Sequence, residues 1–259
     1  MTTNTNKPKK KHSVCLGWMS AGEVRQETTG SMVSTWHYYQ ESSRKVLRGF
    51  VGLQSGPRVA EGRSQIVDAF IKTRCDWLWM VDADMKWEPE ALDQMLCVTE
   101  EYDAKVVGGL CFGGRGGADM FPTIYRFTED EHGLGTDIVR DYPKDEVIKV
   151  AATGAAFLLV HKSVFGEMRK AFGTLPNGQP NPYPWFVESS NGGRPFGEDI
   201  SFCVRCNGLG IPIYIDTSIK VGHIKNIELT EARYLEQEPA PATVEDNQLT
   251  NKGPVLQLP

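Results

Sequence analysis

Two aspartates stand one residue apart in the stretch CDWLWMVDADMKWEP, which covers residues 75–89. Asp82 and Asp84 follow a wholly apolar run, and carboxylates this close repel each other unless a cation lies between them. A divalent metal that carries a phosphate would serve as that cation. The alternative is a turn with two solvated acids, because a DxD pattern by itself is common. The rest of the chain must decide between the two.

Four further polar residues begin or follow expected elements. Arg63 falls in the first turn of a helix, where the helix dipole disfavours a cation. It therefore either binds an anion or is a solvated surface arginine. Glu198 and Asp199 start another helix, where the dipole favours carboxylates with or without a function. His223 follows a strand and a glycine in a turn that can face the same edge, although a lone histidine is usually structural.

The elements around these residues alternate between strands and helices. Residues 77–81 suit a strand buried on both faces, and Pro89 opens a helix with regularly spaced apolar positions. In open α/β sheets ligands bind outside the carboxyl ends of strands, which is where Asp82 and Asp84 stand. We therefore predict a single α/β domain, with a mainly parallel sheet flanked by helices.

Other elements follow from the pattern of apolar residues and glycines. We expect helices at residues 33–50, 62–71, 164–172 and 198–209, and strands at residues 13–18, 49–53, 104–110, 124–127, 147–160 and 211–216. The strand region 147–160 is broken at Gly154, which lets a ligand or another backbone approach closely. Residues 129–146 are a polar surface excursion. The long loop 173–197 carries Tyr183, Trp185 and Phe186, which could stack on a sugar, a base or a peptide.

Length and composition limit the classes to which the protein can belong. The chain has 259 residues, 40% of them hydrophobic, and a formal net charge of −5, which argues against a broad nucleic-acid-binding face but not a local one. No apolar run approaches the roughly 18 residues of a membrane span, and residues 1–12 are expected to be a disordered basic tail rather than a secretory signal. The six cysteines are interpreted as reduced core thiols of a cytoplasmic protein. Residues 228–259 read as an extended tail.

Four stretches, taken in order, resemble the family 2-like glycosyltransferases of the GT-A fold. They are EGRSQIVDAFIKTRCD, WLWMVDADMKWEPEAL, VAATGAAFLLVHKSVF, and PFGEDISFCVRCNGLGIPIYID followed by VGH. The match covers about residues 13–227, and the compact form is similar to transferases of phage and actinobacterial genomes. The expected compartment is the cytoplasm, which would be that of the host if a phage encodes the protein. The family's "ARN" reads Gly62-Arg63-Ser64 here, and its "P.YN" turn is absent. No QxxRW motif is present, which argues against processive polysaccharide synthesis.

The resemblance implies a nucleotide-sugar donor, with a UDP-sugar favoured and a GDP-sugar possible, and a bound Mn²⁺ or Mg²⁺. It implies Asp82, Asp84 and His223 as metal ligands, with Asp82 also toward the ribose. Asp199 would be the general base that takes the acceptor proton, supported by Glu198. The residues expected to contact the donor are Met19, Ser20, Glu23, Arg63, Asp82, Gly154 and Trp185.

Several alternatives stay open. We expect inversion with Asp199 as base, whereas retaining relatives also carry a histidine metal ligand. The acceptor ranks as a protein side chain or glycan hydroxyl first, and as a hydroxylated DNA base second, with Arg115, Arg126 and residues 9–11 as a local basic patch. The rival classes are a metal-dependent phosphoryl transferase or nuclease, which would turn over without a nucleotide sugar, and a non-catalytic nucleotide-sugar binder, which would tolerate Asp199→Asn.

Overall fold

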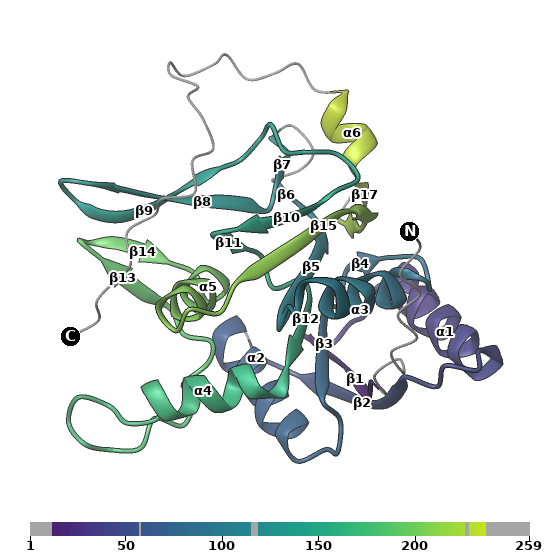
Figure 1. Cartoon of the computed structure of the whole chain (residues 1–259), viewed down its shortest axis with the longest axis horizontal. Coiled ribbons are helices and arrows are strands. Elements are labelled where there is room, and N and C mark those ends of the chain that lie inside the picture. Colours follow the sequence, from purple (N-terminus) through teal and green to yellow (C-terminus); the bar gives the residue numbers. More distant parts are fainter. Residues whose placement is uncertain (1–11, 57, 115–118, 226–227, 237–259) are drawn as a thin grey trace, which may run out of the picture.

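The computed structural model describes residues 12–56, 58–114, 119–225 and 228–236. Its centre is a seven-stranded sheet with helices on both faces (Figure 1). Five strands share one direction, because β2, β1 and β3 pair in parallel and β5 pairs in parallel with β15, while β12 and β10 run the other way. The expected mainly parallel α/β domain is thus confirmed. From edge to edge the order is β10 (Val147–Val150), β15 (Ile213–Lys220), β5 (Val106–Leu110), β12 (Phe157–His161), β3 (Trp77–Asp82), β1 (Val14–Ser20) and β2 (Leu47–Gln54).

Strand β3 separates two apolar layers. Leu78 and Met80 face the layer with helices α2 (Val59–Ile71), α4 (Lys162–Phe172) and α5 (Glu198–Gly208). Trp79 and Val81 face the layer with α1 (Gln26–Glu41) and α3 (Ala91–Tyr102). Because side chains alternate along a strand, an inner strand covered on both faces needs an unbroken apolar run. This burial fixes β3, and with it the position of Asp82, its last residue, and of Asp84, two residues further on.

The predicted helix at residues 33–50 is wrong at both ends. Helix α1 begins earlier and ends at Glu41, and the last four residues of the predicted segment, 47–50, belong to the edge strand β2. Gly49 disfavours a helix at this end of the predicted segment, and Gly52, further along β2, makes room for the Trp18 ring, which would lie 2.4 Å from a Cβ at that position. The buried face of α1 has helical spacing, but it begins with small polar residues that gave no apolar signal: Thr28, Ser31 and Thr35.

The strands outside the main sheet form smaller sheets of two or three strands (Figure 1). The predicted surface excursion after residue 129 is largely a hairpin, and the region 147–160 forms three strands rather than one or two. The first residues of the expected extended tail have regular secondary structure, since residues 228–236 contain a strand and the short helix α6 (Glu231–Leu235). The strands outside the main sheet are β4 (Met85–Lys86), β6 (Phe112–Gly113), β7 (Phe121–Pro122), β8 (Ile124–Asp130), β9 (Gly133–Ile138), β11 (Ala152–Thr153), β13 (Ser189–Asn191), β14 (Arg194–Phe196), β16 (Gly222–Ile224) and β17 (Glu228–Leu229).

The cysteines are free, and five of the six are buried as predicted. Cys97 is the exception, because it lies on the exposed side of α3. The predictions for the N-terminal tail up to residue 11, and for the chain after residue 236, lie outside the described residues. Across the part of the chain that the structure describes, no helix has the length and apolar character needed to cross a bilayer.

Candidate functional site

The turn that carries Asp82 and Asp84 is held from two sides. Its middle residue, Ala83, accepts hydrogen bonds through its carbonyl from the Arg25 N–H at 2.9 Å and from the Thr28 hydroxyl at 3.0 Å, where α1 begins. The Asp84 carbonyl accepts the Ile224 N–H at 2.7 Å. The start of α1 and strand β16, distant in sequence, therefore fix the backbone between the two aspartates.

Arg63 is buried beneath this turn, with 5% of its surface exposed. Its Nη2 lies 3.0 Å from both carboxylate oxygens of Asp82, and its Nε donates to Glu198 at 3.1 Å. Its Nη1 donates to the Ala155 carbonyl at 2.7 Å. Burial by itself lowers the pKa of a guanidinium, but the carboxylates of Asp82, Glu198 and Asp199 outweigh it, so the pKa of Arg63 is raised. Arg63 is thus positively charged, and its ion pairs connect the end of β3 to the start of α5.

This placement differs from the expectation that Arg63 contacts the donor. Its N–H groups face protein acceptors, and a guanidinium offers five donors in a fixed fork that suits such multiple pairing. Arg63 is therefore a positioning residue in this structure: it orients Asp82 and Glu198 rather than facing an open site. The position of Arg63 in the first turn of a helix did indicate an anionic partner, and the partners are the protein's own carboxylates.

Asp84 meets His223 because short strands β4 and β16 pair with His223 opposite Met85. The Nε2 atom of His223 lies 3.2 Å from Asp84 Oδ2, and Lys225 Nζ lies 2.7 Å from the same oxygen. Burial alone would raise the pKa of Asp84, but hydrogen bonds from His223 and Lys225 outweigh it and lower the pKa to about 2. Asp84 is therefore ionised at neutral pH.

The other ring nitrogen of His223 decides what this pair can hold. Nδ1 lies 2.9 Å from the Phe112 carbonyl, which can only accept, so Nδ1 carries a proton. Nε2 then donates to Asp84 Oδ2 when the ring is an imidazolium, and it presents a lone pair to this carboxylate oxygen when the ring is a neutral imidazole. Two acceptors that face each other fit a cation between them, and an imidazole held by a carbonyl is the usual arrangement of a metal-ligating histidine. The donor set of Asp84 and His223 therefore fits a divalent cation.

Asp82 does not join this pair in the structure, because its carboxylate faces Arg63. Within the described ranges, no group of three or more His, Cys, Asp or Glu side chains is arranged to hold a metal. The three residues expected to converge are thus divided into two neighbouring sets, Asp84 with His223 and Asp82 with Arg63. The metal-ligand role of each residue stays a prediction.

Asp199 lies at the start of α5, next to the Arg63 cluster. Its Oδ1 accepts the Ile200 N–H at 2.7 Å, and its Oδ2 would lie 3.7 Å from a Cβ added at Gly154. Burial raises the pKa of Asp199, Glu198 raises it further, and Arg63 lowers it, with a net rise. We expected the helix terminus to keep this carboxyl readily ionised; its burial and the adjacent carboxylate dominate instead.

The other residues expected at the donor fall into two groups. Met19 and Ser20 end strand β1, where Met19 is in register with Asp82, and Glu23 is exposed in the connection to α1. These residues lie at the carboxyl ends of the strands, together with the aspartates. Trp185 is wrong as a stacking residue in this conformation, since it is fully buried and its indole N–H donates to the Phe165 carbonyl at 3.0 Å.

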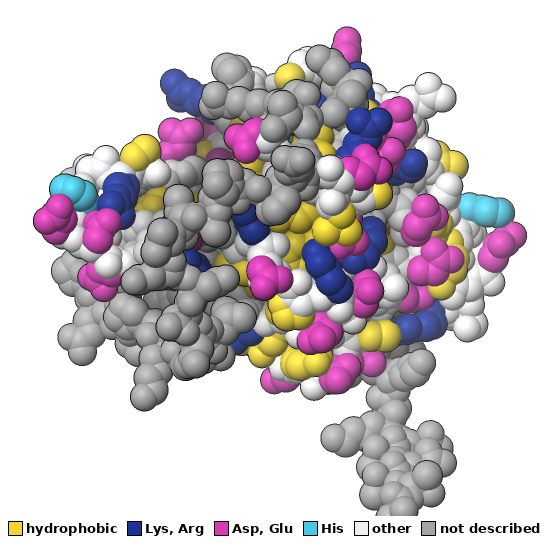
Figure 2. All heavy atoms as spheres, turned by 90° about the horizontal axis from the view of Figure 1, so that it is seen from above, with side chains coloured by type: hydrophobic (Ala, Val, Ile, Leu, Met, Phe, Trp, Pro, Cys, Tyr) yellow, Lys and Arg dark blue, Asp and Glu magenta, His cyan; other side chains and the backbone are white. Residues whose placement is uncertain are grey.

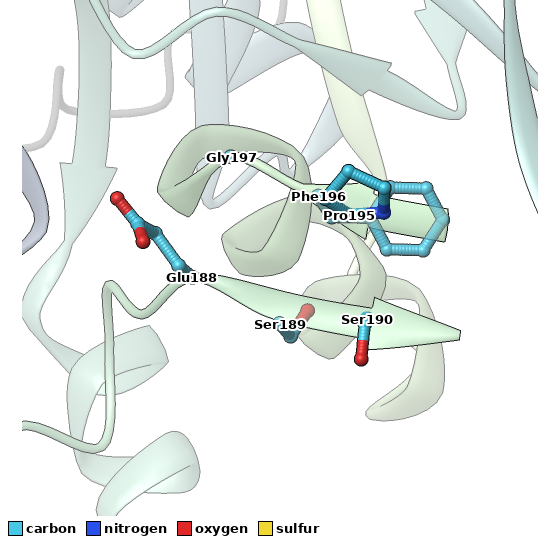
Figure 3. A pocket seen from close by; sticks show the side chains of 6 residues that line it. All are labelled: Glu188, Ser189, Ser190, Pro195, Phe196 and Gly197. Carbon is cyan, nitrogen blue, oxygen red and sulfur yellow. The ribbon is translucent and has the colours of Figure 1, made fainter. Parts of the chain in front are cut away.

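The loop before α5 is folded differently from the aromatic surface that we expected. Phe186 is also buried, and its ring stacks on Phe202 with 4.7 Å between centroids. Residues 174–180 and the β13–β14 hairpin are the exposed parts of the loop, and the hairpin borders a cavity of about 400 Å³ directly before Asp199. Figure 3 shows Ser189 and Ser190 along β13, opposite Pro195 and Phe196, with Glu188 extending away from the hairpin; Gly197 completes the lining.

Sequence reasoning missed Lys225, although it stands two residues after His223 in an extended segment, where alternate side chains share a face. Among the basic residues considered for a DNA acceptor, Arg126 pairs with Asp137 at 3.3 Å, and Arg115 and residues 9–11 lie outside the described residues. On the face shown in Figure 2, the described acidic and basic side chains are interspersed. Neither observation favours a nucleic-acid-binding face.

Comparison with known proteins shows the fold. No protein-family model and no curated protein sequence matches the chain. Among solved structures, "Crystal Structure of A197 from STIV" has a TM-score of 0.55 and 16% identity, with 91% of this chain and 100% of that chain covered. "Crystal structure of GalNAc-T7 with UDP, GalNAc and Mn2+" has a TM-score of 0.55 and 12% identity, with 85% of this chain covered. The matched region spans 45% of the GalNAc-T7 chain. The chain has a GT-A-like fold.

Proposed function

We propose that this protein is a metal-dependent glycosyltransferase that moves a sugar from a nucleotide-sugar donor to a hydroxyl acceptor. The observation that carries the proposal is the Asp84–His223 pair, whose Nε2 and Oδ2 face each other at 3.2 Å at the carboxyl ends of the strands. The proposed donor is a UDP-sugar, with a GDP-sugar as the second choice. The likeness to a structure that contains UDP and Mn²⁺ supports the UDP-sugar and the choice of Mn²⁺ through the fold alone.

Asp84 and His223 would hold the divalent cation, and Asp82 would lie toward the ribose of the donor. Because Mg²⁺ prefers oxygen ligands, the imidazole favours Mn²⁺. When bound, the cation neutralises charge on the diphosphate of the leaving nucleotide. Met19, Ser20 and Glu23 would line the nucleotide side, since β1 ends beside Asp82 in the sheet.

Asp199 is the proposed general base. An inverting transfer needs a base within hydrogen-bond reach of the acceptor hydroxyl, on the side opposite the leaving nucleotide. Burial and the adjacent Glu198 raise the pKa of Asp199, which makes its carboxylate a stronger base. Glu198 raises that pKa and is itself held by Arg63, so it acts on Asp199 from a fixed position.

The proposed acceptor side is the cavity beside the β13–β14 hairpin, which ends at Gly197 immediately before Glu198 and Asp199. Ser189, Ser190 and the Glu188 carboxylate offer hydrogen-bonding groups along this wall, which suits a hydroxyl-rich glycan or a protein side chain. A hydroxylated DNA base is the second choice. Salt separates the two, because activity on DNA would fall steeply with ionic strength and activity on a neutral glycan would not.

The test is nucleotide release from a panel of UDP-, GDP- and dTDP-sugars with Mn²⁺, using the wild type and Asp199→Asn. The proposal predicts release with one nucleotide class and loss of release in the variant. Turnover of a phosphate ester without any nucleotide sugar would favour the phosphoryl transferase instead. Donor binding without release, equal in both proteins, would indicate a non-catalytic binder. NMR of the first-formed product then gives the anomer, and inversion predicts a β-linked product from an α-linked donor.

A further inference from the structure

We propose that Lys225 is a displaceable counter-ion of Asp84, which couples the binding of a divalent cation to the binding of an anionic ligand. The inference rests on the proposed function, because it assigns a role to a residue beside the cation position suggested there. Lys225 is not among the residues that the family resemblance implies.

The geometry places two positively charged or protonatable groups on one oxygen. Lys225 Nζ and His223 Nε2 lie 2.7 Å and 3.2 Å from the same atom, Asp84 Oδ2. The segment between them is clamped, since the Ile224 N–H donates to the Asp84 carbonyl at 2.7 Å. The lysine therefore stands where a cation bound by Asp84 and His223 would take its oxygen ligand.

A divalent cation and an ammonium cannot share this carboxylate oxygen at contact distance, because like charges repel strongly in a partly buried setting. Lys225 must leave when the cation binds, and its side chain is 41% exposed on a flexible stem, so it has room to move. Among the described residues, Asp84 is the carboxylate within ion-pair distance of Lys225. The displaced ammonium then lies beside a bound cation without a carboxylate partner.

A diphosphate removes this unfavourable state. Its oxygens ligate the cation and offer the released ammonium a new anionic partner. The cation alone must therefore displace Lys225 without compensation, whereas the cation with a diphosphate does not. Each ligand consequently raises the affinity of the protein for the other, which is a coupling between the two binding events.

The experiment measures the Mn²⁺ dissociation constant by electron paramagnetic resonance, without and with UDP, for the wild type, Lys225→Met and Lys86→Met. Lys86 is the matched control: it lies on the adjacent strand β4, is 48% exposed and pairs with Glu228 at 3.5 Å rather than with Asp84. Both variants remove one positive charge near the site, but only Lys225→Met frees Asp84.

Without UDP, Lys225→Met is expected to bind Mn²⁺ about two- to fivefold more tightly than the wild type, which is the range of an exposed ion pair. Adding UDP should tighten Mn²⁺ binding less in this variant than in the wild type. Lys86→Met should match the wild type in both conditions. Acetylation of amines followed by mass spectrometry gives a second readout: Mn²⁺ with UDP should change the labelling rate of Lys225 but not that of Lys162, which pairs with Asp76.

Two contrary results have different meanings. If the wild type binds Mn²⁺ and UDP, but Lys225→Met shows the same affinity and the same response to UDP, the role of Lys225 is refuted and the proposed function stands. If neither protein binds Mn²⁺ with or without UDP, the metal-dependent function falls, and the inference falls with it. Equal tightening in Lys86→Met would show a general charge effect and would also refute displacement.

Discussion

The buried Arg63 cluster predicts a large loss of stability when its cation is removed. In Arg63→Met, the carboxylates of Asp82 and Glu198 lose their partner while their side chains are only 26% and 15% exposed. Removing one partner of a buried ion pair costs about 3–5 kcal/mol, because a charge remains without compensation. The partial exposure of Asp82 places this case near the lower end, at about 3 kcal/mol. At roughly 2–4 °C per kcal/mol for a domain of this size, the melting temperature should fall by about 6–12 °C.

Urea unfolding at neutral pH, followed by tryptophan fluorescence, measures this loss directly. Arg58→Met is the matched control, since Arg58 is on the same segment but is 84% exposed and lies 3.9 Å from Glu61. The control should change the free energy of unfolding by no more than about 0.5 kcal/mol. Neutralising the freed carboxylates in Arg63→Met with Asp82→Asn and Glu198→Gln should restore part of the loss. A loss below about 1 kcal/mol in Arg63→Met, or one equal to that of the control, would refute the account of Arg63 as a buried tie between β3 and α5.

Three further predictions follow from individual carboxyl groups. Asp199→Asn should lower the turnover rate at least about a hundredfold while the dissociation constant for the donor changes little, as measured by steady-state kinetics and calorimetry. Since burial raises the pKa of Asp199, the wild-type rate should fall on the acid side at a pH above the ordinary carboxyl range, and a rate that stays flat down to pH 4 would contradict this. Hydrogen bonds from Lys162 and Ser13 lower the pKa of Asp76, so its contribution to stability is present above the ordinary carboxyl pKa of about 4 and is lost as the pH falls below it. Urea unfolding of Asp76→Asn should therefore show a smaller loss of stability on acidification than the wild type, and equal losses would be evidence against it.

The fold was predictable where burial acts on both faces of a strand. The run from Trp77 to Val81 has no polar residue, because each of its side chains enters one of two apolar layers. Helix α1 was not predictable over its first turns, since Thr28, Ser31 and Thr35 satisfy their hydroxyls within the packed interface instead of supplying an apolar stripe. A helical period of small polar residues has no signal in a pattern of hydrophobicity.

The candidate site was predictable as a set of residue types but not as a set of partners. The sequence placed Asp84 and His223 after separate strands, and the pairing of β4 with β16 brings them together. The sequence did not show that Arg63 would form ion pairs with Asp82 and Glu198, because such pairing depends on how α2 packs against the sheet. Trp185 shows the same limit: an aromatic residue in a long polar loop can equally fill the core, as its contact with Phe165 demonstrates.

The measurement that tests the central claim most directly is nucleotide release from the preferred sugar donor as a function of Mn²⁺ concentration. It compares the wild type with Asp84→Asn and His223→Asn, and uses Asp68→Asn as a control, because Asp68 pairs with Lys72 on the surface of α2. The account predicts saturable dependence on Mn²⁺ in the wild type and the control, no release in EDTA, and a loss of release in Asp84→Asn. His223→Asn should require a higher Mn²⁺ concentration for half-maximal release. Wild-type release that persists in EDTA, or an unchanged Mn²⁺ dependence in both site variants, would contradict the claim that Asp84 and His223 hold the cation.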